Sequence, residues 1–426
     1  MVKKILIAFF CMGAYGLFAQ NATISPYSYF GIGDLRDNGS VENQMMGGVS
    51  MYGDSIHINL SNPAAYSKLK LTAYTAGISR TEYRLKDWSA QQNTSVTNLD
   101  YIAIGFPVAK NMGVGFGIMP LSSVGYSLRD ETTNNDGADV INVYNGDGGL
   151  NRIYASIGYQ PMKNLSLGIT ANFNFGTLEY QRVQSVEDVQ FGTVDNRESR
   201  VNGYDFKYAL NYTPTIMDKY TLYASVLVNT QGNLVSKNTQ TLGSFSLSTG
   251  SNIEVVDVDL DATNLRNTEL KIPTRTTVGL GLGEDKRWFM GAEYSFQQFS
   301  DFENRFLGLN NVVYNNASTL AFGGYWIPDH TALTGYFKRV TYRAGLRYDR
   351  TGLEVNNKEI NNFGITFGLG LPLSGATLDT FFSNLNLGFE LGRRGTTDAN
   401  LIEESYLKIN MGISLNDRWF RKTKIN

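Results

Sequence analysis

The sequence predicts an all-β fold, a transmembrane antiparallel β-barrel of about fourteen strands with an N-terminal plug or hatch segment. Three observations lead to this prediction. From about residue 70 onward, apolar residues alternate with small or polar residues at a period of two. Several alternating segments are about ten residues long, the length with which a tilted strand crosses a bilayer. The joins between these segments are alternately short and long.

The composition agrees with strands and argues against spanning helices. The chain of 426 residues contains 44 Gly, 25 Tyr and 24 Phe. After residue 20, no run approaches the roughly 20 apolar residues that a spanning helix needs. Lys and Arg total 37 against 39 Asp and Glu, a formal net charge of −2. The chain therefore lacks the basic field that a nucleic-acid partner requires.

The first twenty residues are typical of a cleavable secretory signal peptide. Two lysines precede a mostly apolar run that ends at Phe18, and cleavage after Ala19 or Gln20 would leave a polar start. An N-terminal anchor helix is the alternative, but the apolar run is short for a span. The one cysteine, Cys11, lies in this segment, so the mature chain would have neither a disulfide nor a thiol nucleophile.

The alternation is clearest from Leu165 to Gly176. One face of this segment carries Leu, Leu, Ile, Ala, Phe and Phe, and the other carries Ser, Gly, Thr, Asn, Asn and Gly. The same pattern recurs over residues 363–371, 385–391 and 407–415. Because a soluble sandwich or propeller also alternates, alternation alone predicts strands and leaves their surroundings open.

The joins between the predicted strands favour a barrel in lipid. Tight joins fall at 109–112, 160–164 and 283–286, and long polar stretches fall at 122–148, 183–200 and 232–266. This asymmetry is typical of periplasmic turns and extracellular loops. Trp288, Trp326 and Trp419 all fall at strand ends on the side of the tight joins, as expected for tryptophan at a membrane interface.

Counting from these joins divides the chain into three parts and the barrel into about fourteen strands. The parts are a signal peptide at 1–20, a hatch or plug at 21–69 and a barrel at 70–426. An even strand number places both termini on the periplasmic side of a bacterial outer membrane. The predicted strands lie near 70–82, 98–108, 112–122, 149–160, 164–177, 202–213, 219–230, 270–283, 287–298, 317–327, 338–349, 360–372, 383–393 and 404–416.

Residues 21–69 do not follow the barrel pattern and are rich in Gly, Asn and Ser. A barrel of about fourteen strands is wider than the eight-stranded barrels that their own side chains fill. The segment could therefore form a plug inside the barrel. A disordered periplasmic leader is the alternative.

The N-terminal segment and the barrel together resemble the FadL family of outer-membrane transporters for hydrophobic compounds. The segments that carry the likeness are Gly31-Ile32-Gly33, Met46-Gly47-Gly48 and Leu60-Ser61-Asn62-Pro63-Ala64-Ala65. The resemblance implies a hatch inside the barrel, with Asn62, Pro63 and Ala64 as hatch residues. It also implies that a small hydrophobic ligand passes toward a lateral opening facing outer-membrane lipid. A purely structural alternative is an Asx-Pro turn that starts the first strand.

The strand faces expected to point into the lumen carry charged side chains. These possible lumen charges are Glu293, Arg343, Arg347, Glu390 and Lys408. They could pair across neighbouring strands and brace the wall, or they could guide a substrate. Members of the resembled family also serve as non-transporting protein partners in outer-membrane machines. Two functions thus stay open: gated passage of small hydrophobic compounds, or a structural partner in an outer-membrane secretion or barrel-assembly complex.

No catalytic residue, metal site or cofactor is expected. His57 and His330 are the only histidines, and neither is spaced for metal binding with another His or with Cys. A hydrolase barrel would need a base placed beside a nucleophile, and neither histidine falls in a segment where that is expected. The carboxylates of Asp257, Asp259 and Asp261 are interpreted as solvated loop charges, with a surface cation site as the alternative.

Overall fold

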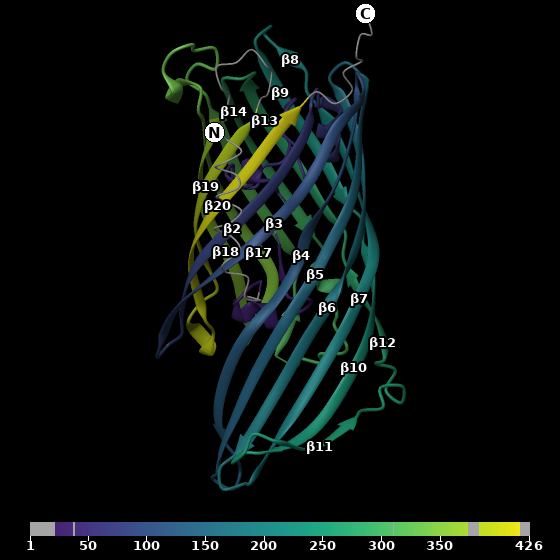
Figure 1. Cartoon of the computed structure of the whole chain (residues 1–426), viewed down its shortest axis with the longest axis vertical. Helices are drawn as coiled ribbons and strands as arrows, with labels where there is room; N and C mark the ends of the chain where they lie inside the picture. The colour runs from purple at the N-terminus through teal and green to yellow at the C-terminus, as the bar shows by residue number, and fades with distance from the viewer. Residues whose placement is uncertain (1–21, 37–38, 310, 374–382, 418–426) are drawn as a thin grey trace, which may run out of the picture.

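The structure is a computed structural model that describes residues 22–36, 39–309, 311–373 and 383–417 (Figure 1). The predicted signal peptide, Cys11 and Trp419 lie outside the described residues. Within them, the chain forms one antiparallel β-barrel whose long strands are tilted relative to the barrel axis.

Fourteen strands close the barrel, as the sequence predicts. Each pairs with the next one around the wall, and the last pairs with the first over Thr72–Lys86 and Glu403–Asp417. In wall order these strands are β2 (Thr72–Lys86), β3 (Gln91–Ala109), β4 (Met112–Thr133), β5 (Asp139–Met162), β6 (Leu165–Val186), β7 (Phe191–Tyr212), β9 (Tyr220–Asn229), β13 (Arg275–Glu284), β14 (Trp288–Gln297), β16 (Ala317–Trp326), β17 (Thr341–Val355), β18 (Lys358–Pro372), β19 (Asn384–Arg394) and β20 (Glu403–Asp417).

The wall is apolar on the outside and polar on the inside. In β6, Leu167 and Ile169 are exposed, whereas the alternate residues Thr170, Asn172 and Asn174 are buried. A soluble sheet has the opposite arrangement, because it buries its apolar face. The strands therefore form a transmembrane barrel, with lipid as the solvent of the outer face.

Three stretches that the sequence analysis assigns to long loops are mostly strand, and that prediction was wrong. Residues 122–148 complete β4 and begin β5, residues 183–200 do the same for β6 and β7, and residues 232–266 contain β10 (Gly232–Ser246) and β11 (Asn252–Asp257). Beyond the bilayer both faces of a strand can meet water, so the hydrophobic alternation disappears while the backbone pairing continues.

One predicted strand, 270–283, is two strands. The first part is β12 (Asn267–Ile272), which pairs with β10, and the second part is β13, which pairs with β9 and β14. Pro273 follows β12, and a proline has no N–H to donate to a ladder. The wall therefore changes partners at this proline.

The outer halves of β4 to β7 continue beyond the closed part of the wall and form, with β10, β11 and β12, an extension of the same sheet, which we call the projecting sheet. β3 pairs with β4 only from Ile102 to Ala109. Beyond this stretch, the edge of β4 that faced β3 has one described strand partner, the two-residue strand β1 (Asp34–Leu35). β7 likewise passes from β9 to β10. In Figure 1 this sheet extends below the rest of the barrel.

The N-terminal segment, residues 22–36 and 39–71, contains mainly short helical turns (purple in Figure 1). They are η2 (Pro26–Tyr29), α2 (Val41–Gln44) and η3 (Pro63–Lys68), and the remaining short elements of the chain are β8 (Thr215–Ile216), η4 (Phe299–Asp301), β15 (Val312–Tyr314), η5 (Tyr336–Lys338) and η6 (Asp398–Asn400). No helix among the described residues has the length and apolar character to cross a membrane.

Glycines in the wall show where this segment lies. A Cβ atom added to Gly168 of β6 would lie 2.2 Å from the Ala64 nitrogen, and one added to Gly345 of β17 would lie 2.2 Å from the Gly47 nitrogen. A Cβ atom on Gly113 of β4 would meet the carbonyl oxygen of Tyr66 at 2.1 Å. These strands lie on different sides of a closed barrel. A segment in contact with all of them lies inside it.

Candidate functional site

The interface between the N-terminal segment and the inner wall is the candidate site. Asn62 begins η3: its Oδ1 accepts from the backbone N–H of Ala64 at 3.1 Å, and Pro63 occupies the first helical position. This is the Asx-Pro turn of the sequence analysis, but it starts a helical turn and not the first strand. Asn62 is fully buried, and its Nδ2 donates to Asn211 Oδ1 of β7 at 3.0 Å.

Pro63 and Ala64 lie against the glycines of two neighbouring strands. The carbonyl oxygen of Pro63 would be 2.6 Å from a Cβ atom on Gly158 of β5, and Ala64 is fully buried beside Gly168. No side chain larger than hydrogen fits the wall at these positions without moving the turn. The three predicted hatch residues are therefore together at one close contact between the segment and the wall.

Glu293 of β14 holds a second part of the segment. Its Oε1 accepts the backbone N–H groups of Ser50 at 2.9 Å and Met51 at 2.6 Å, and the Ser50 hydroxyl lies 3.2 Å away. Glu293 is buried. A buried carboxylate is tolerated only where several donors satisfy it, and here the donors come from the N-terminal segment.

A third contact joins Arg343, Asn386 and Glu42 in a chain. Arg343 Nη1 donates to Asn386 Oδ1 at 3.0 Å, and Asn386 Nδ2 donates to Glu42 Oε1 of α2 at 2.8 Å. His57 lies next to this chain, with Nε2 at 3.9 Å from Glu42 and Nδ1 at 2.6 Å from Asp54. Burial lowers the pKa of His57, but the charge and hydrogen bond of Asp54, together with the charge of Glu42, outweigh it, so the pKa is raised.

The remaining predicted lumen charges either brace the wall, one of the two roles expected from the sequence, or contact the N-terminal segment. Arg347 Nη2 lies 3.0 Å from Glu390 Oε1, and its Nε lies 3.0 Å from Asp349. Tyr406 also donates to Glu390 at 3.1 Å, so these side chains brace β17, β19 and β20. Lys408 Nζ instead donates to Gln44 Oε1 of the N-terminal segment at 3.4 Å.

A cavity of about 400 Å³ lies beside the N-terminal segment inside the barrel. Its lining is mixed: charged side chains such as Glu293 and Arg347 lie beside apolar and aromatic ones such as Phe30, Leu227 and Phe299. A hydrocarbon gains its binding free energy from apolar surface, and here charged groups interrupt that surface. Among the described residues, no group of three or more His, Cys, Asp or Glu is placed to hold a metal ion.

Apolar side chains fill the lumen at the level of the projecting sheet. Its inward face carries Leu150, Leu178 and Leu234, all nearly or fully buried, and Ile32 of the N-terminal segment and Phe302 pack against them. The apolar surface here is covered by the chain itself.

The N-terminal segment also closes the split between β3 and β4. Asp34 and Leu35 of β1 pair with Ser123 and Ser122 on the free edge of β4. The Ser122 hydroxyl donates to the Ile32 carbonyl oxygen at 2.7 Å. The wall thus has a lateral break, and two residues of the segment occupy it as a strand.

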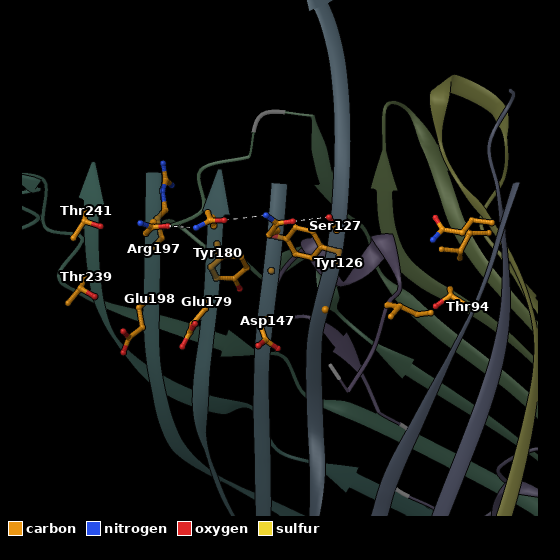
Figure 2. A pocket seen from close by; sticks show the side chains of 18 residues that line it. Thr94, Tyr126, Ser127, Asp147, Glu179, Tyr180, Arg197, Glu198, Thr239 and Thr241 are labelled. Atoms are coloured by element: carbon orange, nitrogen blue, oxygen red, sulfur yellow. Dashed lines mark hydrogen bonds between the residues drawn. The ribbon is translucent and has the colours of Figure 1, made fainter. Parts of the chain in front are cut away.

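The face of the projecting sheet opposite to Leu150 and Leu178 borders a groove of about 710 Å³, which Tyr126 and Tyr180 of the Leu178 cluster also line (Figure 2). Asp147, Glu179 and Glu198 lie directly beside one another on neighbouring strands along this groove. A second row follows toward the tip of the sheet. Its side chains form hydrogen bonds from Ser127 to Asn145, from Asn145 to Gln181 and from Gln181 to Asn196.

The family model named BamG matches this chain over residues 1–426. The chain belongs to the BamG family. Similar solved structures are outer-membrane-type barrels. They include the Ralstonia pickettii toluene transporter TbuX, with 11% identity, 89% of this chain and 98% of that chain covered, and a TM-score of 0.57. At such identity the likeness concerns the fold.

Two further structures agree with this BamG-family chain in fold. The Pseudomonas putida toluene transporter TodX has 15% identity, covers 92% of this chain and 100% of its own, and gives a TM-score of 0.54. A Pseudomonas aeruginosa FadL homologue has 11% identity, with 91% of this chain and 99% of that chain covered and a TM-score of 0.55. The resemblance to FadL barrels seen in the sequence therefore extends to the fold. No curated protein matches the chain.

Sequence reasoning missed several residues of the site in this BamG-family barrel. Asn211 and Asn386, which connect the wall to the N-terminal segment, were not singled out, and neither were the glycines at the contact points. Their signal was present, because the inward faces are rich in Gly and Asn. In a wide water-filled barrel these faces would not need glycine, so its frequency there could have indicated a tightly packed interior.

Proposed function

We propose that this BamG-family barrel lies in the bacterial outer membrane with both termini on the periplasmic side, and that its N-terminal segment is a closed hatch. We further propose that the protein acts as a structural partner of another outer-membrane protein, in a secretion or barrel-assembly complex. The observation that carries this proposal is the fit of the N-terminal segment, which contacts the wall on every side at glycines and buried polar groups.

The hydrogen bonds of the hatch support a barrel that stays closed. If the segment moved away, Glu293 would lose the donors of Ser50 and Met51, and Asn211 would lose Asn62. Net of what water replaces, each hydrogen bond contributes about 0.5–1.5 kcal/mol, and more when one partner is charged, so opening would lose several such contributions together. A small hydrophobic compound has no donor or acceptor to replace those that the segment provides.

Gated passage of small hydrophobic compounds is the second candidate function, and a specific observation favours it. The wall is split between β3 and β4, and the apolar cluster around Leu178 lies inside the barrel at the level of this split. The solved barrels of similar fold include transporters of toluene. In this view the two-residue strand Asp34–Leu35 would have to leave β4 to open the path.

One experiment separates the two functions. The full-length protein is purified from its own membranes in mild detergent, and its native mass is measured; separately, it is inserted in vesicles and toluene entry is timed. We expect a complex of fixed stoichiometry, and toluene entry equal to that of empty vesicles. A protein that purifies alone and speeds toluene entry would overturn the structural role and support passage.

The Glu293→Ala variant tests the hatch assignment separately, because it removes the acceptor of the Ser50 and Met51 backbone N–H groups. If the hatch closes the barrel, this variant should raise ion conductance across a planar bilayer. The matched control is Glu284→Ala, which removes a carboxylate from the end of the neighbouring strand β13, where it pairs with exposed Lys219 and Arg287. Equal conductance in the two variants would contradict the hatch assignment.

A further inference from the structure

The projecting sheet carries an apolar row of its own on the face that holds the groove. Val143, Val183 and Val194 are direct cross-strand neighbours, and Gly243 of β10 connects Val194 with Val255 of β11. Val255 is 54% exposed. The row therefore crosses the sheet and ends at an exposed valine on its last strand.

Polar and charged residues separate this row from the lipid. The aromatic side chains of Phe173, Phe175 and Tyr204 pack together on the same face of the sheet, at the end of the lipid-facing band. Farther out come the carboxylates that include Glu179 and then the hydrogen-bonded row of Figure 2. From Phe175 to Val183 the strand advances eight residues, roughly 26 Å.

Charged side chains rarely face the hydrocarbon of a membrane, so a row of three carboxylates marks a level beyond it. The valine row lies still farther out. Lipid therefore cannot cover it. The three inner valines are half-buried and Val255 is exposed, and an apolar row that reaches the surface outside the membrane is typical of a surface that binds protein.

The strand that ends this row has an open edge. Among the described residues, β11 pairs only with β10. Ile253, Val255 and Val256 are all more than half exposed, so the strand offers apolar side chains on both of its faces. Natural edge strands usually carry charges, bulges or a covering loop that limit pairing. β11 has two of these devices, the carboxylates of Glu254 and Asp257 and a register shift opposite Ser244 and Phe245 of β10, so its edge disfavours a strand of like charge.

We propose that β11 is a docking edge, to which an extended basic segment of a partner protein at the cell surface adds as a further strand. This inference rests on the proposed structural role. Main-chain hydrogen bonds to the open edge would provide affinity, and the valine row would receive alternate apolar side chains of the partner.

The charge around the edge indicates the chemistry of the partner. Residues 251–261 contain four Asp or Glu and no Lys or Arg. Glu254 and Asp257, both exposed, lie within β11 itself. A second copy of this chain would bring the same carboxylates to the new ladder, and like charges on paired strands are destabilising. A lysine- or arginine-containing strand would be attracted.

The test places a photo-crosslinking amino acid at Val255 of the full-length protein in living cells. Leu333 is the matched control, because it is also an exposed apolar residue but lies in the connection between β16 and β17, far from the projecting sheet. We expect an adduct from position 255 and not from 333, and we expect mass spectrometry to map it to an extended, net basic segment of another protein. An adduct with a second copy, with lipid only, or with an acidic or helical segment would overturn the proposal.

Charge reversal completes the test. The double variant Glu254→Lys/Asp257→Lys should reduce the adduct from position 255 by about tenfold or more, as expected if about 1.4 kcal/mol of binding free energy is lost. Acidic substitutions in the mapped partner segment should restore it. Folding of the variant is checked by the heat-dependent shift of the barrel in gel electrophoresis. An unchanged adduct in a folded variant would refute the role of charge.

The outcomes also separate this inference from the proposed function. If the wild-type complex is isolated and the folded Glu254→Lys/Asp257→Lys variant keeps all of its subunits, the docking edge is refuted while the structural role stands. If the protein purifies alone in every case, the structural role itself fails.

Discussion

A single methyl group on the inner wall should loosen the hatch. In Gly168→Ala, the new Cβ atom would lie 2.2 Å from the Ala64 nitrogen and 2.3 Å from the Pro63 carbonyl carbon. Carbon contacts of this kind are ordinarily near 3.5–4 Å, so the turn at Pro63 has to move by more than about 1 Å. Overpacking in a close-fitting interior costs about 1–3 kcal/mol. The barrel should remain folded, because its ladder hydrogen bonds are unaffected.

The assay is amide hydrogen exchange of the protein in lipid vesicles, read in peptides that cover η3. A loss of 1–3 kcal/mol corresponds to exchange about 5- to 150-fold faster if the segment opens locally. The control is Gly232→Ala, whose Cβ atom would lie 3.5 Å from Asp205 Cβ and 3.7 Å from Ile272 Cβ, both ordinary contacts. Unchanged exchange in η3, or equal loosening by the control, would refute the close-fit argument.

Three other predictions concern the N-terminal segment and the wall around it. Asn62→Ala removes the side-chain cap of η3 and leaves the buried side-chain amide of Asn211 without its donor. The free energy of unfolding should fall by about 0.5–2 kcal/mol for the cap and by about 1–3 kcal/mol for the amide. Urea unfolding of the protein in vesicles measures this loss. Arg347→Met should lower the free energy of unfolding by about 3–5 kcal/mol, because Glu390 keeps its charge in a buried position without its partner. The double variant Arg347→Met/Glu390→Met should lose clearly less. Equal losses in the two variants would contradict a stabilising ion pair between these residues. The raised pKa of His57 means that its protonated form stabilises the segment, so this contribution is present below its ordinary pKa of 6.5 and is lost as the pH rises through the raised value. After correction for the intrinsic rise of amide exchange with pH, residues 54–60 should lose protection over that range in the wild type and not in His57→Gln.

The strands that cross the lipid were predictable from the sequence because lipid imposes a strict chemical rule. Each outward residue must be apolar and each inward residue is free to be polar, so segments such as Leu165–Gly176 alternate without interruption. All fourteen predicted strands correspond to wall strands, with the segment 270–283 divided at Pro273.

The projecting sheet was not predictable in the same way. Residues 122–133 and 191–201 pair as regularly as the lipid-crossing strands, but their faces meet water, the groove or an apolar cluster. No single rule sets the polarity of such a strand. Alternation of apolar and polar residues therefore does not predict its backbone pairing.

The candidate site was partly predictable. Charged residues on inward faces, such as Glu293 and Arg347, were found because charges within lipid-crossing strands have to face the lumen. Which of them would hold the N-terminal segment and which would brace the wall depended on partners hundreds of positions away, such as Ser50 for Glu293. No local pattern encodes such a pairing.

By itself, then, the sequence determined that the chain is a lipid-spanning barrel of about fourteen strands. The reason is that successive residues of each strand face lipid and lumen in turn, so apolar and polar residues alternate. Only the tertiary structure decided that the lumen is occupied, that glycines such as Gly168 make room for the N-terminal segment, and that a sheet with an open edge at β11 extends beyond the rest of the barrel. These features arise from contacts between distant segments, and their free energy depends on shape and on buried partners that appear only when the barrel closes.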